Sequence, residues 1–422
     1  MLLKRFLILF LIISVDLIPQ SDLLKTKINH ILSKLPSTTR AGILIYDPIT
    51  RDTLFALNDT ESMIPASNTK LFTTAAALSY LGNDFETSTK FYTDDDDLKD
   101  GIINGNLYIK GFGNSLFGET DLLKTINKLK SLGVFKITGD VIGDDTYFDD
   151  VYSRTDWIPD EIANVTLPPV SALVYENNKT VVARKYKRRI RNYSVNISNP
   201  PLHIANVMRE RLVNHQIEVE GKSIAGTTPA NVHLLDDTRV HLTELLNIIN
   251  KNSDNFLAEC LFKTIGAETS GIQGNSFYAQ QAVLTYIRDN GIFSKGTSLV
   301  DGSGISRFDQ VTPAALVGVL ENMYFDLVNF ETFYNSLSIA GVDGTLRNRL
   351  IGTAAYKNFR GKTGTLNGVS SLSGYLTTTT GDDLIMSFIF EFSRGGASRH
   401  KRIQDEIILL LTDWKSELSL KK

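Results

Sequence analysis

Ser67 and Lys70 stand three residues apart at the start of an apolar segment, PASNTKLFTTAAALSYLG, which runs from Pro65 to Gly82. The segment predicts a buried helix that ends at Gly82. Residues three apart share a helix face, so the two side chains are expected to touch. A serine hydroxyl becomes a nucleophile when a base takes its proton, and a lysine amine with a lowered pKa is such a base. Alone the pattern is weak, because Ser, Asn and Thr are ordinary helix caps.

Two further short motifs strengthen this interpretation. Ser253-Asp254-Asn255 lies in a short break between two helical segments, and Lys362-Thr363-Gly364-Thr365 begins a strand-like segment. Each tripeptide is expected roughly 0.1 times by chance in a chain of this size. The order and local setting of the three motifs therefore predict one catalytic site.

Each motif supplies a definite chemical group. A second cation, Lys362, would help to keep Lys70 neutral and would attract a substrate carboxylate. Ser253 would relay a proton from Lys70 to a leaving amine, and Asn255 would hold a substrate amide.

The strand-like segment would complete the site by binding substrate. Gly364 would let a substrate backbone approach the strand edge. Thr363 would help to hold the carboxylate, and the N–H groups of Ser67 and Thr365 would form an oxyanion hole at the helix N-terminus.

The elements that position these residues come from both ends of the chain. Two strand-like runs flank Asp47-Pro48, a second hairpin is expected around Thr380-Gly381-Asp382, and an amphipathic helix follows near the C-terminus. Between about residues 85 and 237 the chain is richer in strands. We therefore expect an α/β (α+β) fold, with a catalytic domain made of residues 21–83 and 240–422 and an inserted β-rich region, residues 84–239.

Composition narrows the class of protein. The 422 residues carry a formal net charge of −3 and are 42% hydrophobic, which is typical of a globular protein with no general attraction to nucleic acid. Cys260 is the single cysteine, so no internal disulfide is expected, and the six histidines show no zinc-like spacing. We expect neither a metal nor a cofactor.

The N-terminus predicts export. Lys4 and Arg5 precede an apolar run from Phe6 to Val15, the layout of a secretory signal, and we take residues 1–20 as a signal peptide. No small-residue cleavage site follows clearly, which leaves an uncleaved anchor open. The expected location is the periplasm or the cell envelope.

The three motifs together are the signature of penicillin-binding proteins and class A β-lactamases. The chain resembles more specifically the class C low-molecular-mass penicillin-binding proteins, the D-alanyl-D-alanine carboxypeptidase/endopeptidase family. The resemblance extends to DGSGISRFDQVTP, residues 301–313, and to AGVDGTLRNRL, residues 340–350. The 186 residues between Ser67 and Ser253 far exceed the spacing in class A β-lactamases, and the family is known for domains inserted there.

This resemblance implies a serine β-lactamase/DD-transpeptidase-like domain. It implies a serine-type D-Ala-D-Ala carboxypeptidase and/or DD-endopeptidase that acts on peptidoglycan stem peptides through an acyl-enzyme and that β-lactams inhibit covalently. By this resemblance, the expected catalytic residues are Ser67, Lys70, Ser253, Asn255 and Lys362.

Three alternatives remain open at this stage. A β-lactamase of the same fold would need a means of rapid deacylation, and no glutamate loop for it is recognisable. A silent wall-binding scaffold would have no chemical reason to keep the motifs. The basic segment Arg184–Arg191 is either a solvated strand face or a contact with membrane lipid or anionic wall polymer.

Overall fold

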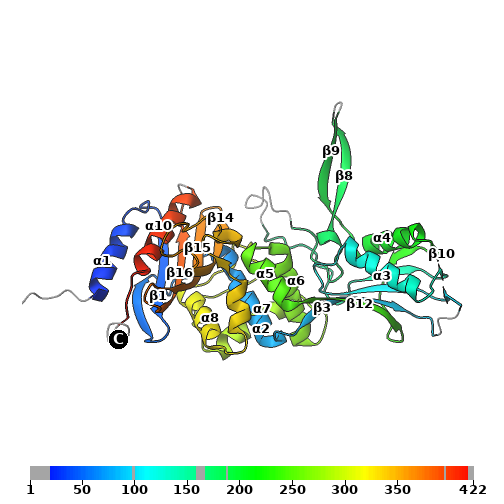
Figure 1. The fold of residues 1–422 in the computed structure, drawn as a ribbon, viewed down its shortest axis with the longest axis horizontal. Helices are drawn as coiled ribbons and strands as arrows, with labels where there is room; N and C mark the ends of the chain where they lie inside the picture. Colours follow the sequence, from blue (N-terminus) through cyan, green and yellow to red (C-terminus); the bar gives the residue numbers. More distant parts are fainter. Residues whose placement is uncertain (1–19, 97–99, 158–166, 187–188, 394–395, 417–422) are drawn as a thin grey trace, which may run out of the picture.

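The computed structural model describes residues 20–96, 100–157, 167–186, 189–393 and 396–416. The predicted signal peptide, apart from Gln20, lies outside these residues. The molecule is elongated: a large sheet lies toward one end, a group of helices follows, and a second β-rich part with a projecting hairpin lies toward the other end (Figure 1). Within the described residues, no helix is both long enough and apolar enough to cross a membrane.

The large sheet takes strands from both ends of the chain. Its order is β13-β14-β15-β16-β1-β2, and β1 pairs antiparallel with β16. At the predicted Asp47-Pro48 turn, Asp47 Oδ1 accepts the backbone N–H groups of Ile49 and Thr50. The strands are β1 (Arg40–Asp47), β2 (Asp52–Leu57), β13 (Ser338–Ile339), β14 (Phe359–Leu366), β15 (Val369–Thr377) and β16 (Asp383–Glu391).

Both faces of this sheet are buried, which explains the continuous apolar run in β16. Leu384, Met386 and Phe388 join a core beneath α1 (Gln20–Leu32) and α10 (Ala397–Leu411). The intervening Ile385 and Ile389 face the opposite core, which includes residues of α8 (Pro313–Phe325). A sheet covered by helices on both faces confirms the predicted mixed α/β class.

A group of helices packs around the core on the second face of the sheet and extends away from the sheet (Figure 1). Their starts follow ordinary capping rules. The Asp254 side chain accepts from Leu257 N, and the Thr312 hydroxyl accepts from Ala315 N, with Pro313 at the first helical position. Besides α8, the helices are α2 (Thr69–Leu81), α5 (Leu242–Lys251), α6 (Asn255–Ser270), α7 (Ser276–Asp289) and α9 (Phe330–Ser336).

The chain leaves and re-enters the helical part through paired strands. β3 (Glu86–Thr93) lies antiparallel to β12 (His233–His241), with Glu86 opposite His241. We propose that this pair marks the boundary of the insertion, residues 84–239, since most of the intervening chain has its own apolar core. The exceptions, which pack into the core of the helical part, are Phe148, Trp157, Val170, Ala172 and Val174.

Within the described residues, the proposed insertion has three further sheets: two in the orders β11-β7-β5-β3-β12 and β10-β6-β4, and a separate two-stranded hairpin. Parallel pairing joins β5 to β7 and β4 to β6, with helices packed alongside. The remaining elements are β4 (Ile102–Ile103), β5 (Leu107–Phe112), α3 (Glu119–Ser131), β6 (Lys136–Ile137), β7 (Val141–Asp144), α4 (Pro200–Asn214), β10 (Glu218–Val219) and β11 (Ser223–Ala225).

The described residues of the basic segment Arg184–Arg191, 184–186 and 189–191, lie on two paired strands rather than on one strand. β8 (Lys179–Tyr186) pairs antiparallel with β9 (Arg189–Asn196), and the hairpin projects away from the rest of the molecule (Figure 1). The single-strand interpretation of this segment is therefore wrong. The sequence here has no glycine or asparagine to signal a turn between the strands.

Candidate active site

Ser67 lies in a short 3₁₀ turn, Ala66–Asn68, immediately before α2. The helix begins at Thr69, later than the Pro65 start suggested by the sequence. Ala66 has φ +49°, a conformation that costs a non-glycine residue about 1 kcal/mol. The turn therefore holds the Ser67 hydroxyl at a strained junction ahead of a buried helix.

The Lys70 amine has three oxygen neighbours. Its Nζ lies 3.1 Å from Ser67 Oγ, 2.6 Å from Asn255 Oδ1 and 2.6 Å from the Ser303 carbonyl oxygen. Lys70 is fully buried, and burial lowers its pKa to about 8 although several carboxylates oppose the change. A neutral amine has two N–H groups and one lone pair. The amide and carbonyl oxygens can only accept, so they take the two N–H groups and leave the lone pair to Ser67.

A loop that the sequence motifs do not include positions the Ser303 carbonyl. Asp301 accepts the backbone N–H groups of Ser303, Gly304 and Ser306 and the indole N–H of Trp157. Sequence reasoning noted this segment only as part of the family resemblance. The succession Asp-Gly-Ser-Gly, which favours an Asx-type turn, is the signal that could have identified it.

Two further buried carboxyl groups support the same loop. Glu259 Oε1 accepts the N–H of Gly302, and Asp309 Oδ2 accepts the hydroxyl of Thr69 at 2.9 Å. Burial, reinforced by the charge of Asp301, raises the pKa of Glu259 to about 8 and raises that of Asp309 well above its usual range. Protonation of these groups weakens their hold on a charged Lys70 and so favours its neutral form.

The second lysine of the site, Lys362, contacts Ser253 of the Ser-Asp-Asn motif. Lys362 Nζ lies 2.8 Å from Ser253 Oγ and 2.8 Å from the Thr363 carbonyl oxygen. Burial and the nearby Lys70 cation lower the pKa of Lys362 well below its usual range. Ser253 lies in the link between α5 and α6 in a left-handed conformation, with φ +58°, and its hydroxyl contacts Lys362 of β14. The segment 253–255 thus contacts both lysines, Lys362 through Ser253 and Lys70 through Asn255.

Strand β14 brings the third motif against the turn that carries Ser67. A side chain at Gly364 would place its Cβ 2.2 Å from Ser371 Oγ, 2.8 Å from the Pro65 carbonyl oxygen and 3.0 Å from Ser67 N. The glycine therefore allows β14 to pack against the turn that carries Ser67. The sequence interpretation, which invoked substrate approach, did not give this reason. Thr365 is exposed beyond it.

One edge of β14 is paired with β13 only at Arg360 and Gly361. Next along the strand, the Thr363 hydroxyl donates to Thr345 Oγ1 at 2.8 Å. The sequence interpretation did not single out Thr345, although it lies within the family-like segment 340–350.

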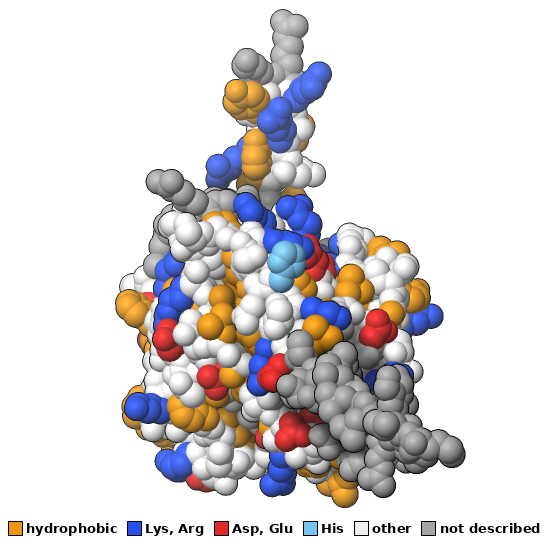
Figure 2. All heavy atoms as spheres, turned by 90° about the vertical axis from the view of Figure 1, so that its left-hand side faces the viewer, with side chains coloured by type: hydrophobic (Ala, Val, Ile, Leu, Met, Phe, Trp, Pro, Cys, Tyr) orange, Lys and Arg blue, Asp and Glu red, His pale blue; other side chains and the backbone are white. Residues whose placement is uncertain are grey.

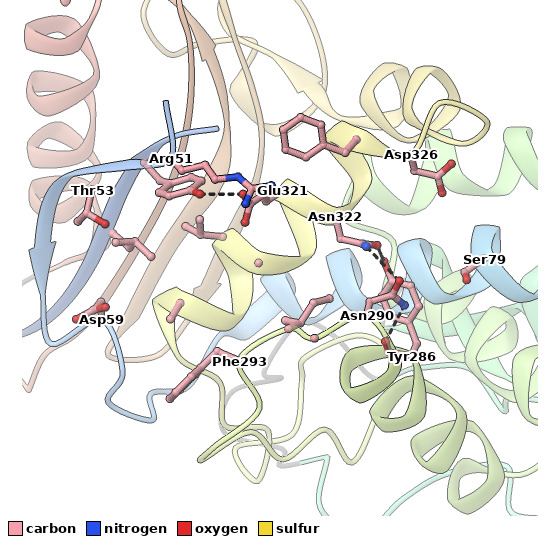
Figure 3. A pocket seen from close by; sticks show the side chains of 18 residues that line it. Arg51, Thr53, Asp59, Ser79, Tyr286, Asn290, Phe293, Glu321, Asn322 and Asp326 are labelled. Carbon is pink, nitrogen blue, oxygen red and sulfur yellow. Dashed lines mark hydrogen bonds between the residues drawn. The ribbon is translucent and has the colours of Figure 1, made fainter. Parts of the chain in front are cut away.

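A cavity of ≈740 Å³ lies elsewhere in the molecule (Figure 3). Glu321 and Asn322 of α8 line it together with Tyr286 and Asn290, and the Tyr46 hydroxyl donates to Glu321 Oε1 at 2.9 Å. None of the residues of the three motifs lines this cavity. Its lining also has no paired nucleophile and base, so the candidate active site is the Ser67–Lys70 cluster.

Comparison with known proteins identifies the family. The model of the D-Ala-D-Ala carboxypeptidase 3 (S13) family matches residues 24–189 and 181–413. The chain belongs to the S13 family. This S13 enzyme is a serine-type D-alanyl-D-alanine carboxypeptidase, as the family resemblance implied.

Curated relatives of this S13 enzyme carry the same activity in their names. It is 28% identical to a D-alanyl-D-alanine carboxypeptidase of an Actinomadura strain, over 89% of this chain and 81% of the relative. It is 26% identical to the D-alanyl-D-alanine carboxypeptidase DacB of Haemophilus influenzae, over 87% of this chain and 89% of the relative.

Solved structures agree on the fold. Penicillin-binding protein 4 of Haemophilus influenzae matches with a TM-score of 0.81 at 23% identity, over 92% of this chain and 99% of that one. A predatory peptidoglycan endopeptidase of Bdellovibrio bacteriovorus matches with a TM-score of 0.55 at 16% identity, over 87% of this chain and 92% of that one. These likenesses confirm the predicted DD-peptidase-like architecture.

Proposed function

We propose that this S13 carboxypeptidase cleaves peptidoglycan stem peptides through an acyl-enzyme on Ser67, with Lys70 as the general base. The observation that supports the proposal is the set of three oxygen atoms around the Lys70 amine. Two acceptor-only oxygens consume its N–H groups, and the lone pair faces the Ser67 hydroxyl at 3.1 Å. A buried amine with a pKa of about 8 has a substantial neutral fraction near neutral pH.

In the first step, Ser67 Oγ attacks the carbonyl carbon of the penultimate D-alanine while Lys70 Nζ takes the hydroxyl proton. The negative oxygen of the tetrahedral intermediate sits between the N–H groups of Ser67 and Thr365. When the C–N bond breaks, the Ser253 hydroxyl gives its proton to the leaving amine and receives in its place the proton that Lys70 took from Ser67. Water then attacks the ester carbon. Lys70, neutral again, takes a proton from this water and returns it to Ser67 Oγ as the ester C–O bond breaks and the peptide acid leaves.

The other motif residues bind substrate in this proposal. Lys362 and Thr363 hold the terminal carboxylate of the peptide. A carboxylate that binds beside Lys362 favours its protonated form and so offsets the effect of burial on its pKa. Asn255 Oδ1 is taken by Lys70, which leaves the Asn255 amide N–H groups for a substrate carbonyl. The unpaired part of the β14 edge accepts the peptide backbone by strand addition.

The same site is proposed to cleave D-alanyl crosslinks as a DD-endopeptidase and to react with β-lactams. A β-lactam presents a strained amide to Ser67, and its ring-opened leaving group stays tethered in the site. We expect the resulting ester on Ser67 to persist, whereas rapid turnover of penicillin would favour a β-lactamase of the same fold. A β-lactam complex has been solved for penicillin-binding protein 4 of Haemophilus influenzae.

The proposal places the enzyme outside the cytoplasm, in the periplasm or cell envelope, since residues 1–20 have the layout of a secretory signal. It includes contact between the basic segment Arg184–Arg191 and an anionic surface of the envelope.

The test is incubation of the enzyme with defined monomeric and crosslinked muropeptides, followed by mass analysis. Loss of one alanine from the monomer supports the carboxypeptidase proposal, and conversion of the crosslinked dimer to monomers supports the endopeptidase part. The Ser67→Ala variant is the control. Equal product from that variant would contradict the proposal.

A further inference from the structure

The β8–β9 hairpin concentrates positive charge in a chain that is acidic overall. Residues Lys179 to Asn196 include seven Lys or Arg residues and no Asp or Glu, whereas the whole chain has a formal net charge of −3. An isolated two-stranded ribbon needs only a few charged residues to protect its edges from pairing with other chains. Seven cations without any compensating carboxylate exceed that need and point to an anionic partner.

The hairpin is also the most projecting described element (Figures 1 and 2). Its two strands form a sheet of their own, and their described residues are almost all exposed. Each strand has eight residues, which corresponds to a length of about 26 Å. A flat surface can therefore meet the distal end of the hairpin before it meets the body of the molecule.

Apolar side chains accompany the cations at the distal end. Tyr186 is 55% exposed and Ile190 is 75% exposed, on opposite faces of the hairpin. The Arg191 guanidinium lies 5.3 Å from the centre of the Tyr186 ring, and Val182 and Tyr193 are paired further down the same face. Figure 2 shows hydrophobic and basic side chains gathered together on the projection. Basic residues accompanied by exposed apolar side chains are typical of segments that bind a membrane surface.

We propose that the described distal residues of the hairpin, Arg184–Tyr186 and Arg189–Arg191, dock on a lipid bilayer that contains anionic phospholipid. The guanidinium and ammonium groups bind lipid phosphates, and Tyr186 and Ile190 enter the boundary between headgroups and acyl chains. A soluble anionic polymer offers phosphates but no apolar phase for these two side chains, so the exposed pair favours the bilayer. The inference deepens the proposed envelope location and rests on it for its setting, whereas its test uses no enzymatic step.

A probe on the hairpin itself separates this contact from any binding by the apolar N-terminal segment. Cys260 is 1% exposed, so an Ile190→Cys variant of the full chain can be labelled at position 190 with an environment-sensitive fluorophore. We expect emission to shift to the blue with vesicles that mix phosphatidylglycerol and phosphatidylcholine, and to stay unchanged with phosphatidylcholine alone. No shift with the anionic vesicles, or an equal shift with both, would overturn the inference.

The charge requirement is tested in the same labelled background. Neutralising the cluster with Arg184→Gln, Lys185→Gln, Arg189→Gln and Arg191→Gln should raise the lipid concentration for half-maximal shift on the order of 100-fold. The matched control neutralises four exposed cations elsewhere: Lys27, Lys130, Lys222 and Lys295. The lipid concentration for its half-maximal shift should stay within about twofold of that of the labelled parent.

Equal weakening by the two quadruple variants would overturn the inference, because net charge rather than the hairpin would then govern binding. A response to soluble polyphosphate but not to vesicles would overturn it in favour of a wall polymer. Covalent labelling of each variant by penicillin provides an independent check of the active site. A hairpin variant that labels normally but no longer responds to vesicles separates this inference from the proposed function.

Discussion

The Ser67 hydroxyl oxygen lies 3.1 Å from the Lys70 amine and differs in kind from the other two partners of that amine. Asn255 Oδ1 and the Ser303 carbonyl oxygen can only accept hydrogen bonds, whereas a hydroxyl can also donate. The Asp301 loop fixes the Ser303 carbonyl, and a helix N-terminus fixes Asn255. The fold thus orients the proposed base, Lys70, before substrate arrives, which is the condition for efficient proton transfer.

The first prediction concerns pH. Lys70 must be neutral to accept the proton, and its pKa is about 8. The rate constant of acylation by penicillin should therefore rise about tenfold per pH unit below that value and level off above it. Stopped-flow labelling between pH 5.5 and 9.5 measures this profile. A rate that falls as pH rises through 7 would contradict the assignment of Lys70 as base.

The second prediction concerns Asn255. In Asn255→Asp a carboxylate replaces the neutral oxygen 2.6 Å from the Lys70 amine, and its negative charge should raise the pKa of Lys70 by about one unit or more. The pH profile of acylation should shift upward by the same amount. Asn255→Ala, which adds no charge, is the matched control: it should be slow without an upward shift. A profile that stays in place in Asn255→Asp would show that Lys70 does not set the pH dependence.

The third prediction concerns the backbone at Ser253. Its φ of +58° suits glycine better than any residue with a Cβ. Ser253→Gly should therefore be more stable than Ser253→Ala by about 1 kcal/mol, measured by urea unfolding. Both variants lack the hydroxyl and should lose acylation alike. Equal stabilities, or acylation near that of the parent protein in either variant, would count against the geometry or the role given to Ser253.

The fourth prediction concerns the loop that presents the Ser303 carbonyl. Asp301→Ala leaves buried backbone N–H groups without their acceptor and should reduce the free energy of unfolding by about 3 kcal/mol. Asp289→Ala removes the same carboxylate from a position where the side chain is 61% exposed. It should change the free energy of unfolding by less than about 0.5 kcal/mol. Chemical denaturation of the two variants makes the comparison. Similar losses in both would show that the Asp301 contacts do not hold the loop.

The sequence predicted those parts of the site that depend on local spacing. Ser67 and Lys70 share a helix turn, so their contact follows from periodicity alone. The Asp301 loop could not be foreseen in the same way, because its role depends on a carbonyl brought to Lys70 from 233 residues away. The tight packing of Gly364 against Pro65 is likewise a tertiary contact.

The fold shows the same division between local and tertiary information. Strand-like runs and helical segments occur at both chain ends, which predicted one domain with a sheet built from both ends. The hairpin at residues 179–196 was missed because it lacks the usual turn residues.

The measurement that tests the central claim most directly is covalent labelling of Ser67→Ala by a fluorescent penicillin, with intact-protein mass spectrometry. The substitution removes one hydroxyl and should change the free energy of unfolding by about 1 kcal/mol or less, so the variant should stay folded. The account predicts a stable penicilloyl adduct on the parent protein, located on the peptide that contains Ser67, and none on Ser67→Ala. An adduct of the same mass on folded Ser67→Ala would contradict the account.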